Sequence, residues 1–387
     1  MEWIYARMAD GIRICGALGE KDRLEVPEEI GGCPVTEIGP YAFSASETPR
    51  RFLMEETARC REKDEGIFEK ADAEKTAGMQ RAVKGDRLSA VSLPDTVKVI
   101  GDYAFYGCGN LETISFTDSL KRIGSGALMG CSAVKELRVI RKREGAMSLC
   151  QMLSELRYAL AVTIQERDGE IRLIFPEYYE VSVENIPARI FETHVHGTGY
   201  RYRQCFRGGE VDYRTYDGLF CLAVSQEPAQ VVTELALSRL RYPKELSAEA
   251  KNGYLSYFSS HVREAGEYLL KQDDLDSIRL IAKEGGFGMD AREMEEVSLP
   301  AYGTEDEPPA DGAGDFYMAS LGEGGFGGSP VDKAESYRLR ETAEHKAAID
   351  VMLEMAGQMG RTECLGFLMD FRHRKGTGDR AKRVFEL

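Results

Sequence analysis

A unit of 23 residues recurs in the first third of the chain, and this fixed period constrains the fold more than any other feature of the sequence. In the two clearest copies, residues at equivalent places are one period apart: Ile100 and Ile123, Gly101 and Gly124, Cys108 and Cys131. A repeat of this length indicates stacked units, each of which buries a face that it could not bury alone. We therefore expect a solenoid that serves as a binding scaffold rather than as an enzyme.

The first part of each copy alternates apolar and polar residues, which is typical of a half-buried strand. In the second clear copy, Leu111, Ile114 and Phe116 are expected to lie in the core, whereas Thr113 and Ser115 are expected on the open face of the sheet.

Two other repeated positions have simple expected roles. Gly101 and Gly124 suit a turn that requires a positive φ. Cys108 and Cys131 are most simply small buried apolar groups, and their spacing does not by itself make them a disulfide.

Two segments carry the repeat. Residues 11–43 hold an earlier copy, with Ile12-x-Ile14-x-Gly16, then Leu24-x-Val26-Pro27, Pro34-Val35, Ile38-Gly39 and Ala42-Phe43. A fourth copy begins within residues 88–139, with Val134, Leu137 and Val139. Together, residues 11–43 and 88–139 resemble BspA-like leucine-rich repeat proteins. The resemblance covers roughly a fifth of the chain, and it implies a right-handed solenoid used for protein or glycan contacts, often at the cell surface.

Composition narrows the choice of partners and of compartment. The net charge of −15 argues against nonspecific binding to nucleic acid or to an anionic membrane. No apolar run approaches the roughly 20 residues that span a bilayer. The first ten residues lack the basic start and the long apolar segment of a secretory signal. Nine cysteines without a Cys-x-x-Cys pair suggest reduced thiols. We therefore expect a cytoplasmic protein.

The organisation predicts three parts. A leucine-rich-repeat domain, residues 1–140, carries an insertion at 44–87 with ten basic and ten acidic residues, typical of a solvated helix or a mobile loop. A central α+β region follows at 141–226, and a helical domain at 227–387.

The central region shows one helix pattern and one hairpin pattern. Leu149, Met152, Leu153 and Leu156 share one helical face. Residues 161–175 predict a β-hairpin with Asp-Gly at its turn. After Pro176, residues 178–186 are interpreted as a short helix.

The last third predicts helices. Ser247 is a candidate N-cap for residues 248–260. Residues 265–270 and 273–282 predict two short antiparallel helices, and residues 347–356 and 360–369 resemble an ankyrin repeat pair. Between them, residues 293–332 contain ten acidic residues and no Lys or Arg, which predicts a disordered acidic, glycine-rich loop.

Two sequence motifs resemble known functional sites. His194 and His196 resemble the His-x-His metal pair of amidohydrolases, because two residues of one strand that are one residue apart can face one metal. A catalytic zinc needs about three protein ligands, and no third ligand is evident. Tyr200 to Arg207 interleaves aromatic residues with Arg, and on an acidic chain we expect local packing or a protein contact there.

The sequence thus predicts an α+β multidomain protein, with a short leucine-rich-repeat solenoid, a central α+β region and a C-terminal ankyrin-like helical array. We expect a noncatalytic protein–protein interaction scaffold, with no metal and no cofactor. The alternatives are a metal-dependent hydrolase centred on His194 and His196, and a cell-surface adhesin for host protein or glycan. The expected partner-binding face consists of open-face strand positions: Glu25, Ser92, Thr113, Ser115, Glu136 and Arg138.

Overall fold

The structure is a computed structural model that describes residues 1–46, 82–143, 148–185, 190–287 and 347–385. The chain divides into two compact units. Unit 1 consists of Met1–Tyr179 with Val195–Tyr254, and unit 2 of Glu180–His194 with Leu255–Leu387.

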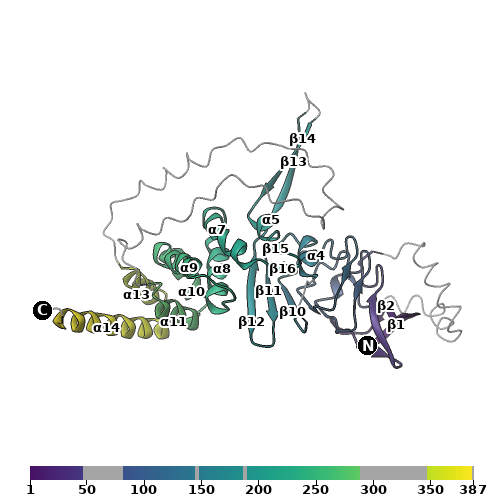
Figure 1. Cartoon of the computed structure of the whole chain (residues 1–387), viewed down its shortest axis with the longest axis horizontal. Helices are drawn as coiled ribbons and strands as arrows, with labels where there is room; N and C mark the ends of the chain where they lie inside the picture. The colour runs from purple at the N-terminus through teal and green to yellow at the C-terminus, as the bar shows by residue number, and fades with distance from the viewer. Residues whose placement is uncertain (47–81, 144–147, 186–189, 288–346, 386–387) are drawn as a thin grey trace. The chain divides into compact units, whose positions relative to one another are not determined.

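The repeats of unit 1 form a solenoid with two sheets (Figure 1). The first sheet runs in the order β1 (Glu2–Met8), β2 (Gly11–Leu18), β5 (Cys33–Ile38), β7 (Val99–Ile100) and β9 (Arg122–Ile123), and β4 (Glu29–Ile30) pairs with β5. β1 and β2 form an antiparallel hairpin, and the later strands of the path are parallel.

The second sheet contains the predicted repeat strands. Its order is β3 (Arg23–Glu25), β6 (Ala90–Ser92), β8 (Thr113–Thr117), β10 (Glu136–Ile140), β11 (Leu160–Gln165) and β12 (Glu170–Phe175). The first five strands are parallel, and β12 returns antiparallel beside β11. The predicted hairpin at 161–175 is confirmed, and it extends the sheet of the repeats.

The core of the solenoid is made by the inward residues of each copy. Leu111 is fully buried, and Ile114 and Phe116 are each 1% exposed, which confirms the predicted alternation. The rings of Phe43 and Phe105 stack at 5.4 Å between their centroids. Each large apolar side chain buried in this way contributes about 1.5–3 kcal/mol.

The prediction of a positive φ at Gly101 and Gly124 is wrong. The positive φ occurs two residues later in each copy, at Tyr103 (55°) and Gly126 (62°). Glycine is needed at 101 and 124 for a different reason. A Cβ on Gly101 would lie 2.6 Å from the backbone nitrogen of Pro40, and neighbouring coils can therefore approach closely only at a residue without a side chain.

Both ends of the predicted insertion 44–87 belong to the solenoid. Ser44 is fully buried, Val83 is 1% exposed, and η1 (Gly85–Arg87) lies in the same coil. Residues 47–81 are outside the described residues.

The remainder of unit 1 is mainly helical. Its elements are α4 (Leu149–Ser154), α5 (Gly199–Tyr202), β15 (Phe206–Arg207), β16 (Glu210–Val211), α6 (Tyr213–Gly218), α7 (Phe220–Gln226), α8 (Ala229–Arg241) and the start of α9 (Ala248–Ser260). The predicted face of α4 is confirmed, because Leu149, Met152, Leu153 and Leu156 are all buried. α8 packs against β12.

A buried ion pair joins α6 to α8. The Arg239 guanidinium donates to both carboxylate oxygens of Asp217, at 2.6 and 2.9 Å. The Tyr254 hydroxyl donates to the same carboxylate at 2.7 Å. Arg239 is fully buried, so this pair is possible only because each charge is matched and hydrogen-bonded.

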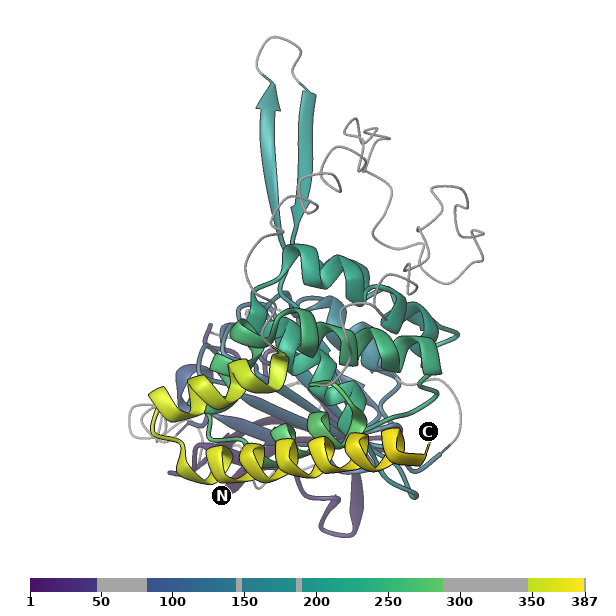
Figure 2. The same cartoon turned by 90° about the vertical axis from the view of Figure 1, so that its left-hand side faces the viewer.

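The prediction of a helix at 178–186 is wrong. Residues Tyr179–Asn185 form strand β13, which pairs with β14 (Ile190–His196), and Figure 2 shows the two strands as a long hairpin. Apolar and polar residues alternate from Tyr179 to Glu184, and the stretch includes two β-branched valines, which favours a strand.

Unit 2 contains the predicted C-terminal helices: α10 (Val262–Lys271), α11 (Leu275–Glu284), α13 (Ala348–Gln358) and α14 (Thr362–Phe385). α10 packs against α11 and α13, and α14 packs against α11 and α13. The N-cap of α9 in unit 1 is confirmed, since the Ser247 hydroxyl accepts from the Ala250 N–H at 3.1 Å. The ankyrin-like character stays a prediction, and the acidic segment 293–332 lies outside the described residues.

Candidate interaction surface

The second sheet gathers all six residues of the expected partner-binding face on its open side. The register pairs them directly across adjacent strands in two rows: Glu25, Ser92, Ser115 and Arg138 in one, and Thr113 and Glu136 in the other. Paired residues in neighbouring strands are about 4.8 Å apart, so each row is a continuous line of side chains.

The same strands present a uniform row to the core and a varied row to solvent. Leu24, Val91, Ile114 and Leu137 are each at most 2% exposed. Between them, Glu25, Ser92 and Arg138 are exposed, and Thr113, Ser115 and Glu136 are half-buried. Repetition therefore keeps one shape on the inner side and leaves the chemistry of the outer side free to differ.

Two further residues continue the longer row, and sequence reasoning did not include them. Arg138 pairs with Thr163 of β11, and Thr163 pairs with Arg172 of β12. The alternation within the predicted hairpin indicated which of its residues point outward. The 23-residue repeat ends at β10, however, so it could not predict which residues of β11 lie beside those of β10. We call the six predicted residues, together with Thr163 and Arg172, the open face.

The shorter row becomes buried toward β12. Glu136 is followed by Ala161 and then Ile174, which are 8% and 5% exposed. The open face is therefore widest on β8 and β10 and narrows to a single row on β11 and β12.

A charged pair lies at the centre of the open face. The Arg138 guanidinium donates to the Glu136 carboxylate at 2.8 Å, and the Thr163 hydroxyl donates to the other carboxylate oxygen at 3.2 Å. Burial alone would raise the pKa of Glu136, but these hydrogen bonds and the charge of Arg138 hold it below its usual value. Glu136 therefore stays ionised and fixed in place.

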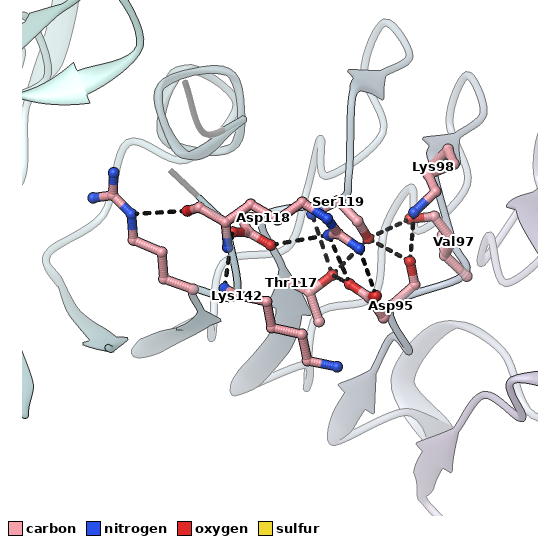
Figure 3. A network of polar contacts seen from close by, with 9 residues as sticks. Asp95, Val97, Lys98, Thr117, Asp118, Ser119 and Lys142 are labelled. Carbon is pink, nitrogen blue, oxygen red and sulfur yellow. Dashed lines mark hydrogen bonds and ion pairs between the residues drawn. The ribbon is translucent and has the colours of Figure 1, made fainter. Parts of the chain in front are cut away.

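A polar network, the turn cluster, lies where the strands of the second sheet end (Figure 3). It consists of Asp95, Thr117, Asp118, Ser119 and Arg143. Arg143 donates to both carboxylate oxygens of Asp95, at 3.0 and 2.8 Å, and to Asp118 at 3.3 Å. Thr117 donates to Asp95 at 3.1 Å and shares a 2.7 Å hydrogen bond with Ser119.

The turn cluster is internally satisfied. Every carboxylate oxygen of Asp95 and Asp118 accepts a hydrogen bond, including those from the backbone N–H groups of Lys142 and Arg143 to Asp118. The hydrogen bond from Arg143 is the main reason that the pKa of Asp95 is lowered well below its usual range. Carboxylates held in this way fix the turns, and they are poorly suited to act as general bases.

The two histidines of the metal hypothesis lie on one strand, β14, and both are exposed. The His196 ring stacks on Tyr179 at 5.0 Å between centroids. Among the described residues, no group of three or more His, Cys, Asp or Glu could hold a metal ion.

The Arg-rich aromatic segment 200–207 is confirmed as local structure. Tyr202 is fully buried, and the Arg203 side chain is buried and lies over the Tyr178 ring at 5.1 Å. Its guanidinium donates to backbone carbonyls at 2.6 to 3.0 Å: those of Leu156, Tyr158, Pro176 and Gly199. Desolvation lowers the pKa of Arg203 to about 10, and the group stays charged at neutral pH.

Eight of the nine cysteines lie in the described ranges, and all eight are free thiols. Cys108 and Cys131 are buried, as predicted. Each thiol donates to a backbone carbonyl of the preceding coil, Cys108 to Phe43 at 3.3 Å and Cys131 to Phe105 at 3.1 Å. Within the described ranges, no helix is long and apolar enough to cross a lipid bilayer.

Comparison with known proteins identifies the class of the repeats. Residues 80–164 match the family described as BspA type leucine rich repeat region, in six copies. This part of the chain is therefore a BspA-type leucine-rich repeat region, and the resemblance drawn from residues 88–139 is confirmed.

Two solved structures are similar to part of the chain. A leucine rich cell surface protein from Faecalibacterium prausnitzii A2-165 is 22% identical over 36% of this chain and 31% of its own, with a TM-score of 0.22. The T. pallidum leucine rich repeat protein is 21% identical over 35% of this chain and 68% of its own, with a TM-score of 0.19. The chain thus spans about a third of the first of these proteins. No curated protein matches the chain in sequence.

Proposed function

We propose that this protein is a noncatalytic protein–protein interaction scaffold and that the open face is its main binding surface. The observation that carries the proposal is the strand register, which aligns side chains of different chemistry in rows over a uniform apolar core. A second contact region is proposed on the helical module formed by α10, α11, α13 and α14.

The geometry of the open face favours binding for two physical reasons. Its backbone is fixed by parallel ladders, and Ser92, Ser115 and Thr113 have short side chains, so little conformational entropy is lost when a partner binds. At the centre, Arg138 is already held by Glu136. Arg is among the residues that contribute most to protein interfaces.

The charge of the chain supports a protein partner rather than nucleic acid or a membrane. A net charge of −15 disfavours binding to phosphate backbones and to anionic lipids. The free thiols support a reducing compartment, and we propose that the protein acts in the cytoplasm.

Site-specific photo-crosslinking in the native cells tests the proposal. The photoreactive residue would replace Ser92 on the open face or, as a matched control, Ser125, which is also exposed but lies in a turn of the same repeats. We expect one protein to be captured from position 92 and not from position 125. Capture of the same proteins from both positions, or of none from position 92, would count against the open face.

Metal analysis of the purified protein distinguishes the scaffold from the hydrolase alternative. A metal-dependent hydrolase centred on His194 and His196 requires metal bound in a fixed ratio, which is lost on His196→Ala. The scaffold requires no metal, and elemental analysis of the wild type and the variant distinguishes the two functions.

A further inference from the structure

β1 is the last strand of the first sheet on its N-terminal side. It pairs with β2 on one edge, and no described strand pairs with its other edge. Alternate N–H and C=O groups of its seven residues therefore point away from the sheet, as they do along any edge strand.

Among the described residues, the edge at β1 has few of the features that normally prevent strand addition, although its ladder with β2 has an irregularity between Ile4 and Tyr5. Edge strands are protected when they are short, or when they carry Lys, Pro or several charges. β3, the corresponding edge of the second sheet, has three residues, and two of them are Arg23 and Glu25. β1 has seven residues and contains neither Lys nor Pro.

β1 also exposes apolar side chains. Ile4 is 41% exposed, and Met1, next to the strand, is 47% exposed. Trp3 and Tyr5 are half-buried. A long apolar edge strand whose outer main-chain groups no described strand pairs with is a template for another strand.

We propose that two copies of this chain associate through their β1 strands, which pair antiparallel about a twofold axis at Ile4. A twofold axis normal to the sheet places each residue opposite one on the same face of the partner strand. With Ile4 opposite Ile4 of the second copy, Trp3 lies opposite Tyr5. The two first sheets then become one continuous sheet.

The charges of the chain favour this strand as the place where two copies meet. Each copy carries a net charge of −15, so most surfaces of one copy repel the other. β1 is locally neutral, since Glu2 and Arg7 cancel. In the proposed register neither charge lies opposite a like charge: Glu2 faces Ala6, and Arg7 faces Met1. Aromatic and β-branched cross-strand pairs stabilise such a contact.

Sedimentation equilibrium of the full chain tests the proposal. We expect the wild type to reach twice the mass of one chain as its concentration rises. Ile4→Lys and Ile4→Glu should each give a monomer, because they place two like charges opposite each other at the axis. Met129→Lys is the matched control, since Met129 is 55% exposed in unit 1 and lies outside β1. This control should remain a dimer.

Mixing the two Ile4 variants tests the register itself. An equimolar mixture should recover the dimer, because the lysine introduced into one copy would then face the glutamate introduced into the other. Recovery also shows that both variants are folded. A wild type that stays monomeric, a dimer that survives Ile4→Lys, or a mixture that stays monomeric would overturn the proposal. The open face belongs to the other sheet, so failure here leaves the proposed function to its own test.

Discussion

The two ends of the solenoid are finished in different ways, although both belong to the same stack of coils. At the N-terminal end, the hairpin of β1 and β2 closes the first sheet, and one edge of β1 has no partner among the described strands. At the C-terminal end, the hydrogen-bond ladders of the strands end against side chains and helices that are not part of the repeat. A stack of identical units leaves unpaired backbone groups at its last coil, and those groups need partners.

Two side chains supply such partners at the C-terminal end. In the inner coils, the N–H groups of Tyr103 and Phe105 donate to carbonyls of the next coil, at 3.0 and 2.9 Å. One period later, the N–H groups of Gly126 and Leu128 donate to the carboxylate of Glu155. At the edge of β12, the Tyr216 hydroxyl takes the place of a further strand. Arg143 joins the last turns in another way, through the carboxylates of Asp95 and Asp118.

Strand edges in this protein are thus either closed by specific polar groups or left without a partner among the described strands. Where a hydroxyl or carboxylate satisfies the backbone, the solenoid ends. Where main-chain groups and apolar side chains remain together, as at β1, we infer that another strand is added. Substitutions at the C-terminal end test the first half of this account.

The largest effect is expected for Tyr216→Phe. The Tyr216 hydroxyl donates to the Ile174 carbonyl at 2.6 Å and accepts from the Ile174 N–H at 2.9 Å, and the tyrosine is fully buried. Without the hydroxyl, two buried backbone groups lose their partner, which should lower the free energy of unfolding by about 2–4 kcal/mol.

Urea unfolding and the hydrogen exchange of the Ile174 amide measure this effect. Tyr158→Phe, in a tyrosine that is 49% exposed, is the control and should change neither quantity. Unchanged exchange at Ile174 in Tyr216→Phe would show that the edge of β12 does not depend on the hydroxyl.

An intermediate effect is expected at Glu155. Glu155→Ala leaves the N–H groups of Gly126 and Leu128 without their acceptor and should cost about 1–3 kcal/mol. Glu155→Gln keeps an amide oxygen in the same place and should lose less than half as much. Equal losses in the two variants would mean that the side chain acts by packing rather than as an acceptor.

The same residue gives a test by pH. Desolvation raises the pKa of Glu155 in the folded state, despite the two backbone hydrogen bonds. A raised folded pKa adds stability that is fully present below the unfolded pKa and is lost as the pH rises through the folded value. The wild type should therefore gain stability relative to Glu155→Gln as the pH falls through the carboxyl range, and a constant difference would contradict the shift.

The smallest effect is expected for Arg143→Met. The Arg143 side chain is 52% exposed, and solvent screening leaves exposed ion pairs with little effect on stability. Arg143 is the main cause of the lowered pKa of Asp95. The ion pair between Arg143 and Asp95 therefore adds stability that is present above the usual pKa of Asp. This stability is lost as the pH falls through the pKa of Asp95 in the folded state.

Thermal midpoints at neutral and at acidic pH measure the small contribution of the Arg143–Asp95 pair to stability. The difference between the wild type and Arg143→Met should shrink in acid, whereas Arg122→Met, in an exposed arginine of β9, should show no such trend. A loss of stability as large as that of Tyr216→Phe would mean that the turn cluster holds the end of the solenoid more strongly than surface ion pairs can.

The sequence predicted what depends on periodicity. Alternation within each 23-residue copy identified the buried Ile114 and the outward Ser115 correctly, because each coil repeats one environment. The helices of unit 2 were predicted at residues 265–282 and, from the likeness to an ankyrin repeat pair, at residues 347–369, and Ser247 was predicted from its place before α9.

What the sequence did not predict depends on single contacts across the chain. Glu155 is one glutamate among many acidic residues, and nothing near it in sequence marks it as the acceptor for Gly126. Thr163 and Arg172 joined the open face only when the register of β11 was known. Residues 178–186 were assigned to a helix although their alternation favoured a strand, since a short segment after a proline gives little other information.

Partner binding by a matched pair of charge reversals tests the central claim most directly. Arg138→Glu changes the centre of the open face, and Arg122→Glu makes the same substitution at an exposed arginine of the other sheet. The partner captured at position 92 would be titrated against each full-length variant. We predict that Arg138→Glu weakens binding at least tenfold, which is a loss of about 1.4 kcal/mol or more in binding free energy. Arg122→Glu should bind within twofold of the wild type. Equal affinities for the two variants would contradict a binding role for the open face.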